Sequence, residues 1–83
     1  MLAVFKALAN TNRINILKAI AHSPAGSLTV NEIAQELNLA QPKISDHLKL
    51  MRINRIVRAR QNGTKMNYFI KDPIVPKLIK MLE

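Results

Sequence analysis

The chain has 83 residues, and thirteen lysines and arginines against five acids give it a formal net charge of +8. This length allows one small domain, the size at which a partner subunit often completes the burial of a single core. Half of the residues are hydrophobic, so disorder is not expected, while scarce aromatic residues and the lack of cysteine exclude stacking platforms for single strands, disulfides and thiolate metal sites.

The first part of the chain is predicted to form three helices. The first spans roughly residues 2–9, and Asn10 then offers polar N-cap chemistry for the second. The second helix has apolar residues at three- and four-residue spacing until the segment 23–27, with its proline and glycine, breaks it. Thr29 followed three residues later by Glu32 is the pattern of a capping box, which predicts the start of the third helix.

A fourth helix is predicted to follow after the short connection 38–40. Pro42 falls in its first turn, where the missing N–H costs nothing and the fixed φ is already helical. Ile44, Leu48 and Met51 fall on one face and are expected to pack inward, whereas the other face is polar and basic. The third and fourth helices are joined by a short turn, and the fourth has a polar and basic outer face. This arrangement is that of a helix-turn-helix.

After Arg55 the pattern changes from a helical period to that of strands. Residues 56–61 and 64–70 are predicted to form two strands, joined by a tight turn at Asn62 and Gly63. A type I′ turn needs positive φ at both central residues, and Asn-Gly is the pair that best provides it. The predicted fold is therefore mainly α with a small β-hairpin, in the order of four helices, two strands and one more helix.

The last predicted helix begins at Asp72 and Pro73 and is mostly apolar. It offers more apolar surface than a short helix needs for docking on its own domain. We expect it to pair with the first helix across a two-fold axis, which predicts a homodimer. The predicted dimer residues are Leu2, Val4, Phe5, Ile74, Val75, Leu78, Ile79, Met81 and Leu82.

The segment from Lys43 to Lys65 contains seven basic residues and a single acid, Asp46. Because it covers a helix and the adjoining hairpin, it suits a groove lined with phosphates better than a merely solvated face. Gln41 and Ser45 are expected to contact base edges, and Asp46 to bridge to a neighbouring lysine rather than to accept from cytosine. The predicted DNA-contacting residues are Gln41, Pro42, Lys43, Ser45, Asp46, Lys49, Arg52, Arg58, Arg60, Asn62, Gly63, Thr64 and Lys65.

Two segments and the hairpin together resemble the winged-helix ArsR/SmtB family of repressors. The similar parts are residues 5–17 and 41–50, followed by a wing with Gly63 and Tyr68. The resemblance implies a winged helix-turn-helix whose fourth helix enters the major groove, with the hairpin wing on the backbone. It also implies that the terminal helices pair two subunits, which would then read a pseudo-palindromic operator.

The chain departs from this family where metals bind. Thr29 and Asn31 stand where the best-known metal sensors carry a Cys-x-Cys motif, and the last helix contains no histidine. No metal and no cofactor are therefore expected. His22 is expected to act as a favourable residue at a helix C-terminus, and His47 to pack beside the apolar stripe.

Two backbone positions also depart from the family pattern. Ala40 stands where a side-chain N-cap of the fourth helix would be expected, and Arg55 stands where the family commonly has glycine. We expect Asn54 to adopt the left-handed conformation there instead.

The most specific function that these observations support is sequence-specific binding of double-stranded DNA by a transcriptional repressor. The chain has no glycine-rich phosphate loop, no recognisable nucleophile context and no paired-carboxylate pocket, so no enzyme and no catalytic residue are predicted. Two alternatives stay open: an architectural DNA-binding protein of low specificity, and a winged helix used for protein–protein contact. No apolar run has the length of a signal-peptide core or a membrane span, which predicts a cytoplasmic location.

Overall fold

The computed structural model describes residues 2–83, which form five helices and a three-stranded antiparallel sheet. The predicted fold class, a mainly helical winged helix-turn-helix, is confirmed. In chain order the elements are α1 (Leu2–Leu8), α2 (Thr11–His22), β1 (Ser27–Thr29), α3 (Val30–Leu37), α4 (Gln41–Ile53), β2 (Val57–Asn62), β3 (Lys65–Ile70) and α5 (Ile74–Met81).

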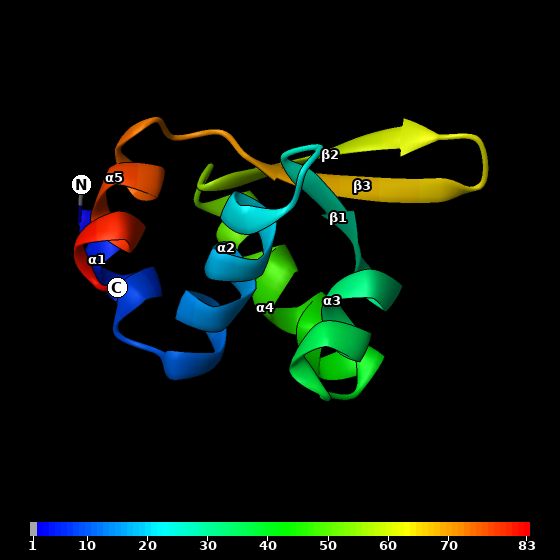
Figure 1. Ribbon diagram of the computed structural model, residues 1–83, viewed down its shortest axis with the longest axis horizontal. Coiled ribbons are helices and arrows are strands. Elements are labelled where there is room, and N and C mark those ends of the chain that lie inside the picture. Colours follow the sequence, from blue (N-terminus) through cyan, green and yellow to red (C-terminus); the bar gives the residue numbers. More distant parts are fainter. Residues whose placement is uncertain (1) are drawn as a thin grey trace.

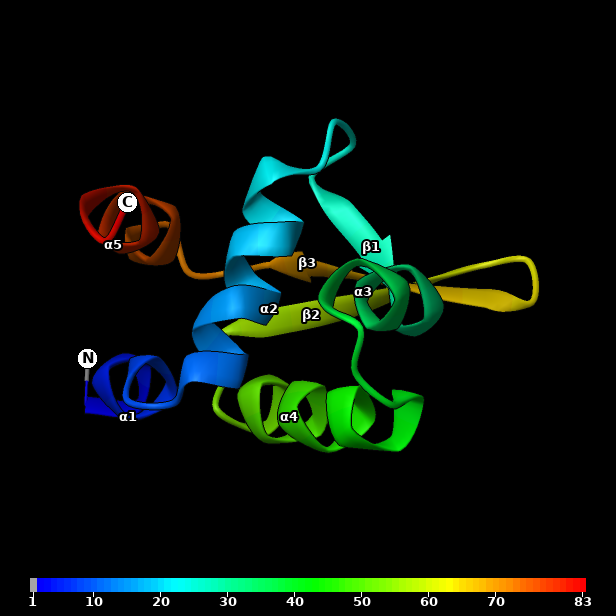
Figure 2. The same ribbon diagram turned by 60° about the horizontal axis from the view of Figure 1, so that its bottom comes forward.

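The hairpin of β2 and β3 projects from one end of the molecule, while α1 and α5 lie at the opposite end (Figures 1 and 2). Between these ends α2 crosses the molecule, and α3 and α4 form the helix-turn-helix beside it (Figure 2). The strand order is β1-β3-β2, so β2 forms one edge of the sheet. The basic hairpin therefore stands clear of the helical body as a wing.

The core forms where α2, α3, α4 and the inner face of the sheet meet. Ile16, Leu17 and Ile20 of α2 are fully buried there. Each such side chain contributes about 1.5–3 kcal/mol through the apolar surface that it removes from water. The three predicted inward residues of α4, Ile44, Leu48 and Met51, are also fully buried. The orientation of α4 follows from this anchoring.

Helix α1 is joined to α2 through two caps. Asn10 accepts a hydrogen bond from the backbone N–H of Arg13 at 3.1 Å, which confirms it as the N-cap of α2. The Arg13 guanidinium in turn donates to the backbone carbonyls of Ala7 and Lys6, both at 3.1 Å. The Lys6 carbonyl also accepts from the Ala9 N–H. Because both carbonyls lie at the C-terminus of α1, where intrahelical donors run out, Arg13 holds the two helices together.

Thr29 and Glu32 form the predicted capping box at the start of α3. The Thr29 hydroxyl accepts from the Glu32 N–H at 3.1 Å, and the Glu32 carboxylate accepts from the Thr29 N–H at 2.8 Å. Hydrogen bonding to the Thr29 backbone N–H, and secondly to the Thr29 side chain, holds the pKa of Glu32 below its ordinary value. This N-terminus is thus firmly set.

The C-terminus of α4 corrects one expectation. Arg55, not Asn54, adopts the left-handed conformation, with a φ of 62° against −86° for Asn54. The Ile56 N–H bonds to the Met51 carbonyl and the Arg55 N–H to that of Arg52, which is the hydrogen-bonding pattern of a Schellman motif. Burial of Ile56 beneath the helix end fixes this geometry, and the arginine adopts the required φ.

The turn of the wing lies one residue later than predicted. Asn62 pairs with Lys65 and closes the hairpin, so the two loop residues are Gly63 and Thr64. Only Gly63 has positive φ in this loop, at 65°. A type II′ turn needs glycine at just this first central position, whereas the predicted type I′ turn would need positive φ at both.

Strand β1 was not predicted. It is three residues long and pairs with β3, with Leu28 opposite Tyr68. A segment this short carries no alternation that distinguishes a strand from a loop. It extends the predicted hairpin to a sheet and ties the start of α3 to the base of the wing.

Candidate nucleic-acid interface

Helix α4 presents a polar face because its apolar face is locked into the core. Gln41, Ser45, Lys49 and Arg52 follow one another at four- and three-residue intervals and are all exposed. Ala40 gives no side-chain cap, as expected from the sequence, and its carbonyl accepts the N–H groups of the first turn. The outward face of α4 is therefore a rigid row of donors and cations.

The turn between α3 and α4 fixes the angle of this face. Asn38 ends α3 in the left-handed conformation, with a φ of 54°, and the Leu39 N–H bonds to the Ala34 carbonyl at 3.1 Å. Asparagine is one of the few residues that adopt this conformation readily. Leu39 also packs against the core, which leaves the connection little freedom.

The tip of the wing carries four predicted DNA-contacting residues: Asn62, Gly63, Thr64 and Lys65, all exposed. The remaining nine predicted residues lie on α4 and β2 and are exposed as well. The structure thus gathers all thirteen on the outward face of α4, the base of the wing and its tip. Their contact with DNA stays a prediction.

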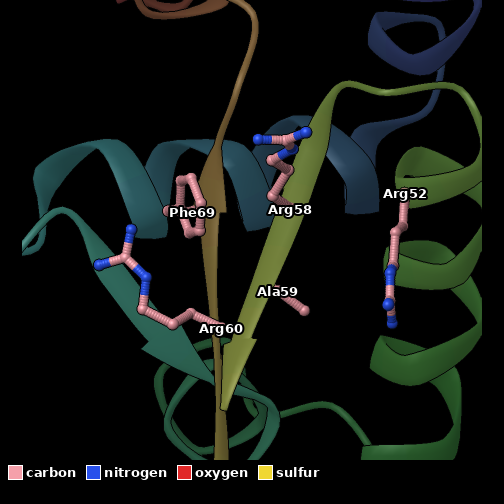
Figure 3. A pocket seen from close by; sticks show the side chains of 5 residues that line it. All are labelled: Arg52, Arg58, Ala59, Arg60 and Phe69. Atoms are coloured by element: carbon pink, nitrogen blue, oxygen red, sulfur yellow. The ribbon is translucent and has the colours of Figure 1, made fainter. Parts of the chain in front are cut away.

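Three arginines, together with Ala59 and Phe69, line a hollow of about 380 Å³ between the C-terminal end of α4 and the wing, with Arg58 and Arg60 beside Phe69 and Arg52 across β2 from them (Figure 3). Arg52 comes from α4, while Arg58 and Arg60 come from β2. Arg60 lies over the ring of Phe69, with its guanidinium carbon 5.1 Å from the ring centroid. This cation–π contact orients the guanidinium and covers the outer face of the ring. Tyr68, its neighbour in β3, packs on the core.

None of these three arginines pairs with an acid. Among residues 2–83 the structure shows a single ion pair, between His22 and Glu83, far from the wing in sequence. The arginines of the hollow are therefore available to an external anion. A surface that concentrates unpaired guanidinium groups in this way favours phosphate binding.

Asp46 corrects another expectation. Its carboxylate makes no salt bridge to Lys43 or Lys49 within the described part of the chain. The side chain is exposed on α4 next to Ser45.

The two histidines lie apart from one another in the fold. His47 is half-buried on α4, and this burial, with Arg13 and Lys43 nearby, lowers its pKa below the ordinary value. The lowered pKa favours the neutral form of the imidazole. His22 ends α2, as predicted, and contacts the Glu83 carboxylate. Residues 2–83 bring together no group of three or more potential metal-ligating side chains.

A second hollow, of about 590 Å³, separates the first turn of α4 from the wing. Thr29, Asn31 and Glu32 of the α3 N-terminus form one side, with Gln41 beside them and Lys65 on the wing. The Gln41 amide donates from Nε2 to Oδ1 of Asn31 at 2.7 Å. Sequence reasoning missed Asn31 as part of this surface, because nothing in its spacing shows that α3 brings it against α4.

The apolar surface of the terminal helices is smaller than predicted. Val4, Val75 and Ile79 are at most 3% exposed and pack into the core of their own chain, so these three cannot form a dimer contact. One face of each terminal helix is buried against its own domain, so only the remaining surface is free to contact a partner. The exposed remainder includes Leu2, Phe5, Met81 and Leu82, and most of these border an apolar hollow of about 330 Å³ between α1 and α5.

Within residues 2–83, no helix combines the length and the hydropathy needed to cross a lipid bilayer.

Comparison with known proteins gives one consistent family. Residues 10–59 match the model described as "Bacterial regulatory protein, arsR family". An uncharacterized HTH-type transcriptional regulator of Methanocaldococcus jannaschii is 40% identical over 80 residues, covering 96% of this chain and 88% of that protein. Against two curated regulators of Mycobacterium tuberculosis, the chain spans 56% and 57% of their length.

Solved structures of similar fold belong to regulators of the same kind. The antimony-specific transcriptional repressor AntR superimposes with a TM-score of 0.86 at 31% identity, covering 96% of this chain and 70% of that one. A homodimeric winged helix-turn-helix DNA-binding domain from Mycobacterium bovis gives a TM-score of 0.82 at 30% identity, with 98% and 72% covered.

Proposed function

The chain belongs to the ArsR family of transcriptional regulators, and we propose that it binds double-stranded DNA sequence-specifically as a homodimer and represses transcription. One observation carries the proposal. The exposed row on α4 continues, through three unpaired arginines, onto a basic wing, and Asp46 is the only acid in that stretch of sequence. Helix α4 would lie in the major groove with Gln41 and Ser45 at the base edges, and the wing would follow the phosphates.

The homodimer is supported by the apolar surface between α1 and α5. Phe5, Leu8, Leu78, Met81 and Leu82 line the apolar hollow there, at the end of the molecule opposite the wing tip (Figure 1). A two-fold axis at this end would cover the exposed side chains and place the two α4 helices on one side. The Mycobacterium bovis domain of the same fold is homodimeric, which supports this arrangement for the present chain.

Selection of bound sequences from random duplex DNA tests the proposal. A two-fold dimer should enrich a pseudo-palindromic sequence whose half-site centres lie about 10 base pairs, or a multiple of that, apart. Enrichment of a single unrepeated site would contradict the dimer. Failure to enrich any sequence, although the protein binds duplex DNA, would contradict sequence-specific binding.

The wing variants Arg60→Ala and Lys65→Ala should weaken binding to every duplex about equally. Each removes one phosphate contact, so the slope of log affinity against log salt should become shallower by about one unit per contact. Anisotropy titrations at several salt concentrations measure this. Lys77→Ala is the matched control, because it removes the same charge from an exposed position on α5. Wing variants that behave like this control would show that the wing does not touch the backbone.

We also propose that transition metals and metalloids do not regulate this chain, although the AntR repressor is described as antimony-specific. Arsenite and antimonite bind through soft thiolates, and the chain contains no cysteine. Adding zinc, nickel or arsenite should leave the melting temperature and the DNA affinity unchanged. A tight stoichiometric zinc site in titration calorimetry would contradict this.

A further inference from the structure

Asn31 and Gln41 join the two helices of the helix-turn-helix through a single amide–amide contact. Gln41 Nε2 donates to Asn31 Oδ1 at 2.7 Å. Asn31 lies in the first turn of α3, two residues after the Thr29 cap, and Gln41 is the first residue of α4. Both backbones are rigid at these points, because the capping box fixes one and Pro42 the other.

The pair lies where a nucleic acid would pass. Both residues border the 590 Å³ hollow between the start of α4 and the wing, opposite Lys65. Both side chains are exposed, so neither serves the core. A hydrogen bond between two exposed amides adds little to folding stability, which leaves orientation of the side chains as its main consequence.

The contact determines what Gln41 can offer to a base. A glutamine amide has two N–H donors and one carbonyl acceptor, and its terminal torsion is broad when nothing holds it. Donation to Asn31 occupies one N–H and leaves one N–H and the oxygen free. One donor and one acceptor are the complement of adenine N7 and its N6 amine in the major groove.

We propose that Asn31 is a positioning residue that sets the specificity of Gln41 for adenine. Asn31 acts by accepting one amide proton of Gln41, so that the remaining donor and acceptor meet the base in a fixed orientation. This inference rests on the proposed function, since it assumes that α4 lies in the major groove.

The test begins by finding the base pair that Gln41 reads. Sequences are selected from random duplexes with the unmodified protein and with Gln41→Ala. Comparison of the two selections identifies the operator position at which the base preference is lost, and this position should be an A·T pair. The affinities for that operator and for its substituted versions are then measured with Asn31→Ala. Preference for the A·T pair should fall about two- to tenfold, the range expected for one hydrogen bond, with the melting temperature unchanged.

Two further variants separate positioning from a structural role. Asn31→Asp keeps the accepting oxygen, so it should retain the base preference while weakening binding to all duplexes through repulsion by phosphate. Gln35→Ala removes an exposed amide elsewhere on α3 and should change neither quantity. The double variant with both Asn31 and Gln41 replaced by alanine should lose no more preference than Gln41→Ala alone, because the two residues act as one unit.

The outcomes distinguish this inference from the proposed function. If Gln41→Ala loses the preference and Asn31→Ala retains it, the positioning role is wrong and the base contact stands. The role is also wrong if Asn31→Asp loses as much as Asn31→Ala, or if Gln41 reads a G·C pair. If Gln41→Ala leaves every preference intact, the base contact itself is overturned.

Discussion

Replacing Met81 by aspartate should convert the protein from a dimer to a folded monomer. Met81 is 81% exposed, so the substitution leaves the core of the subunit intact. In the proposed dimer it would bury a carboxylate without a partner among apolar side chains, which is strongly unfavourable. Affinity for an operator with two half-sites should fall about a hundredfold or more, because the second half-site is no longer bound as part of the same molecule.

Sedimentation at micromolar concentration, with DNA titrations beside it, measures both effects. Ile53→Asp is the matched control for oligomeric state, because it introduces the same charge at an exposed apolar residue of α4 rather than of α1 or α5. It should remain a dimer. An unmodified protein that sediments as a 9.4 kDa species, or a Met81→Asp variant that stays dimeric, would contradict the proposed interface.

Gln41→Ala and Ser45→Ala should reduce discrimination between operator and random DNA rather than overall binding. If Gln41 makes a bidentate base contact, its loss should narrow the free-energy gap between the two DNAs by about 1–3 kcal/mol. Affinity for random duplexes should change little, since that binding depends on phosphate contacts. Parallel titrations with operator and shuffled duplex measure the gap. Equal losses on both would place these residues on the backbone.

The helices could be predicted because their determinants are local. The Asn10 cap, the Thr29 and Glu32 box, and the spacing of Ile44, Leu48 and Met51 each act within a few residues, and each prediction was confirmed. Asp72 likewise accepts from the Ile74 N–H at the start of α5, as its position before a proline indicated.

The errors arose where tertiary contacts decide between local alternatives. Asn-Gly favours a type I′ turn, yet the pairing of β3 with both neighbours sets a register in which Gly63 comes first in the loop. At the end of α4 the buried Ile56 requires a left-handed residue just before it, and Arg55 occupies that position whatever its own preference.

The candidate site was predictable in its residue types but not in its geometry. The position of the basic surface could be predicted, because the number of basic residues in a segment is read directly from the sequence. The sequence could not show that Asp46 makes no salt bridge to a lysine. Nor could it show that Val75 and Ile79 are buried in the core of their own subunit. The contact between Asn31 and Gln41 also depends on the packing of α3 against α4, which no local pattern encodes.

Sequence-specific binding is tested most directly by the ratio of two affinities, one for a selected operator and one for a shuffled duplex of the same length. Both affinities are measured at several salt concentrations. Both affinities should fall steeply as salt rises, because both depend on phosphate contacts. The ratio itself should be at least about 10³ and should change little with salt, since base contacts carry it. A ratio near one at every salt concentration would contradict the account and favour an architectural DNA-binding protein, and no salt-dependent binding at all would favour a protein–protein interaction module.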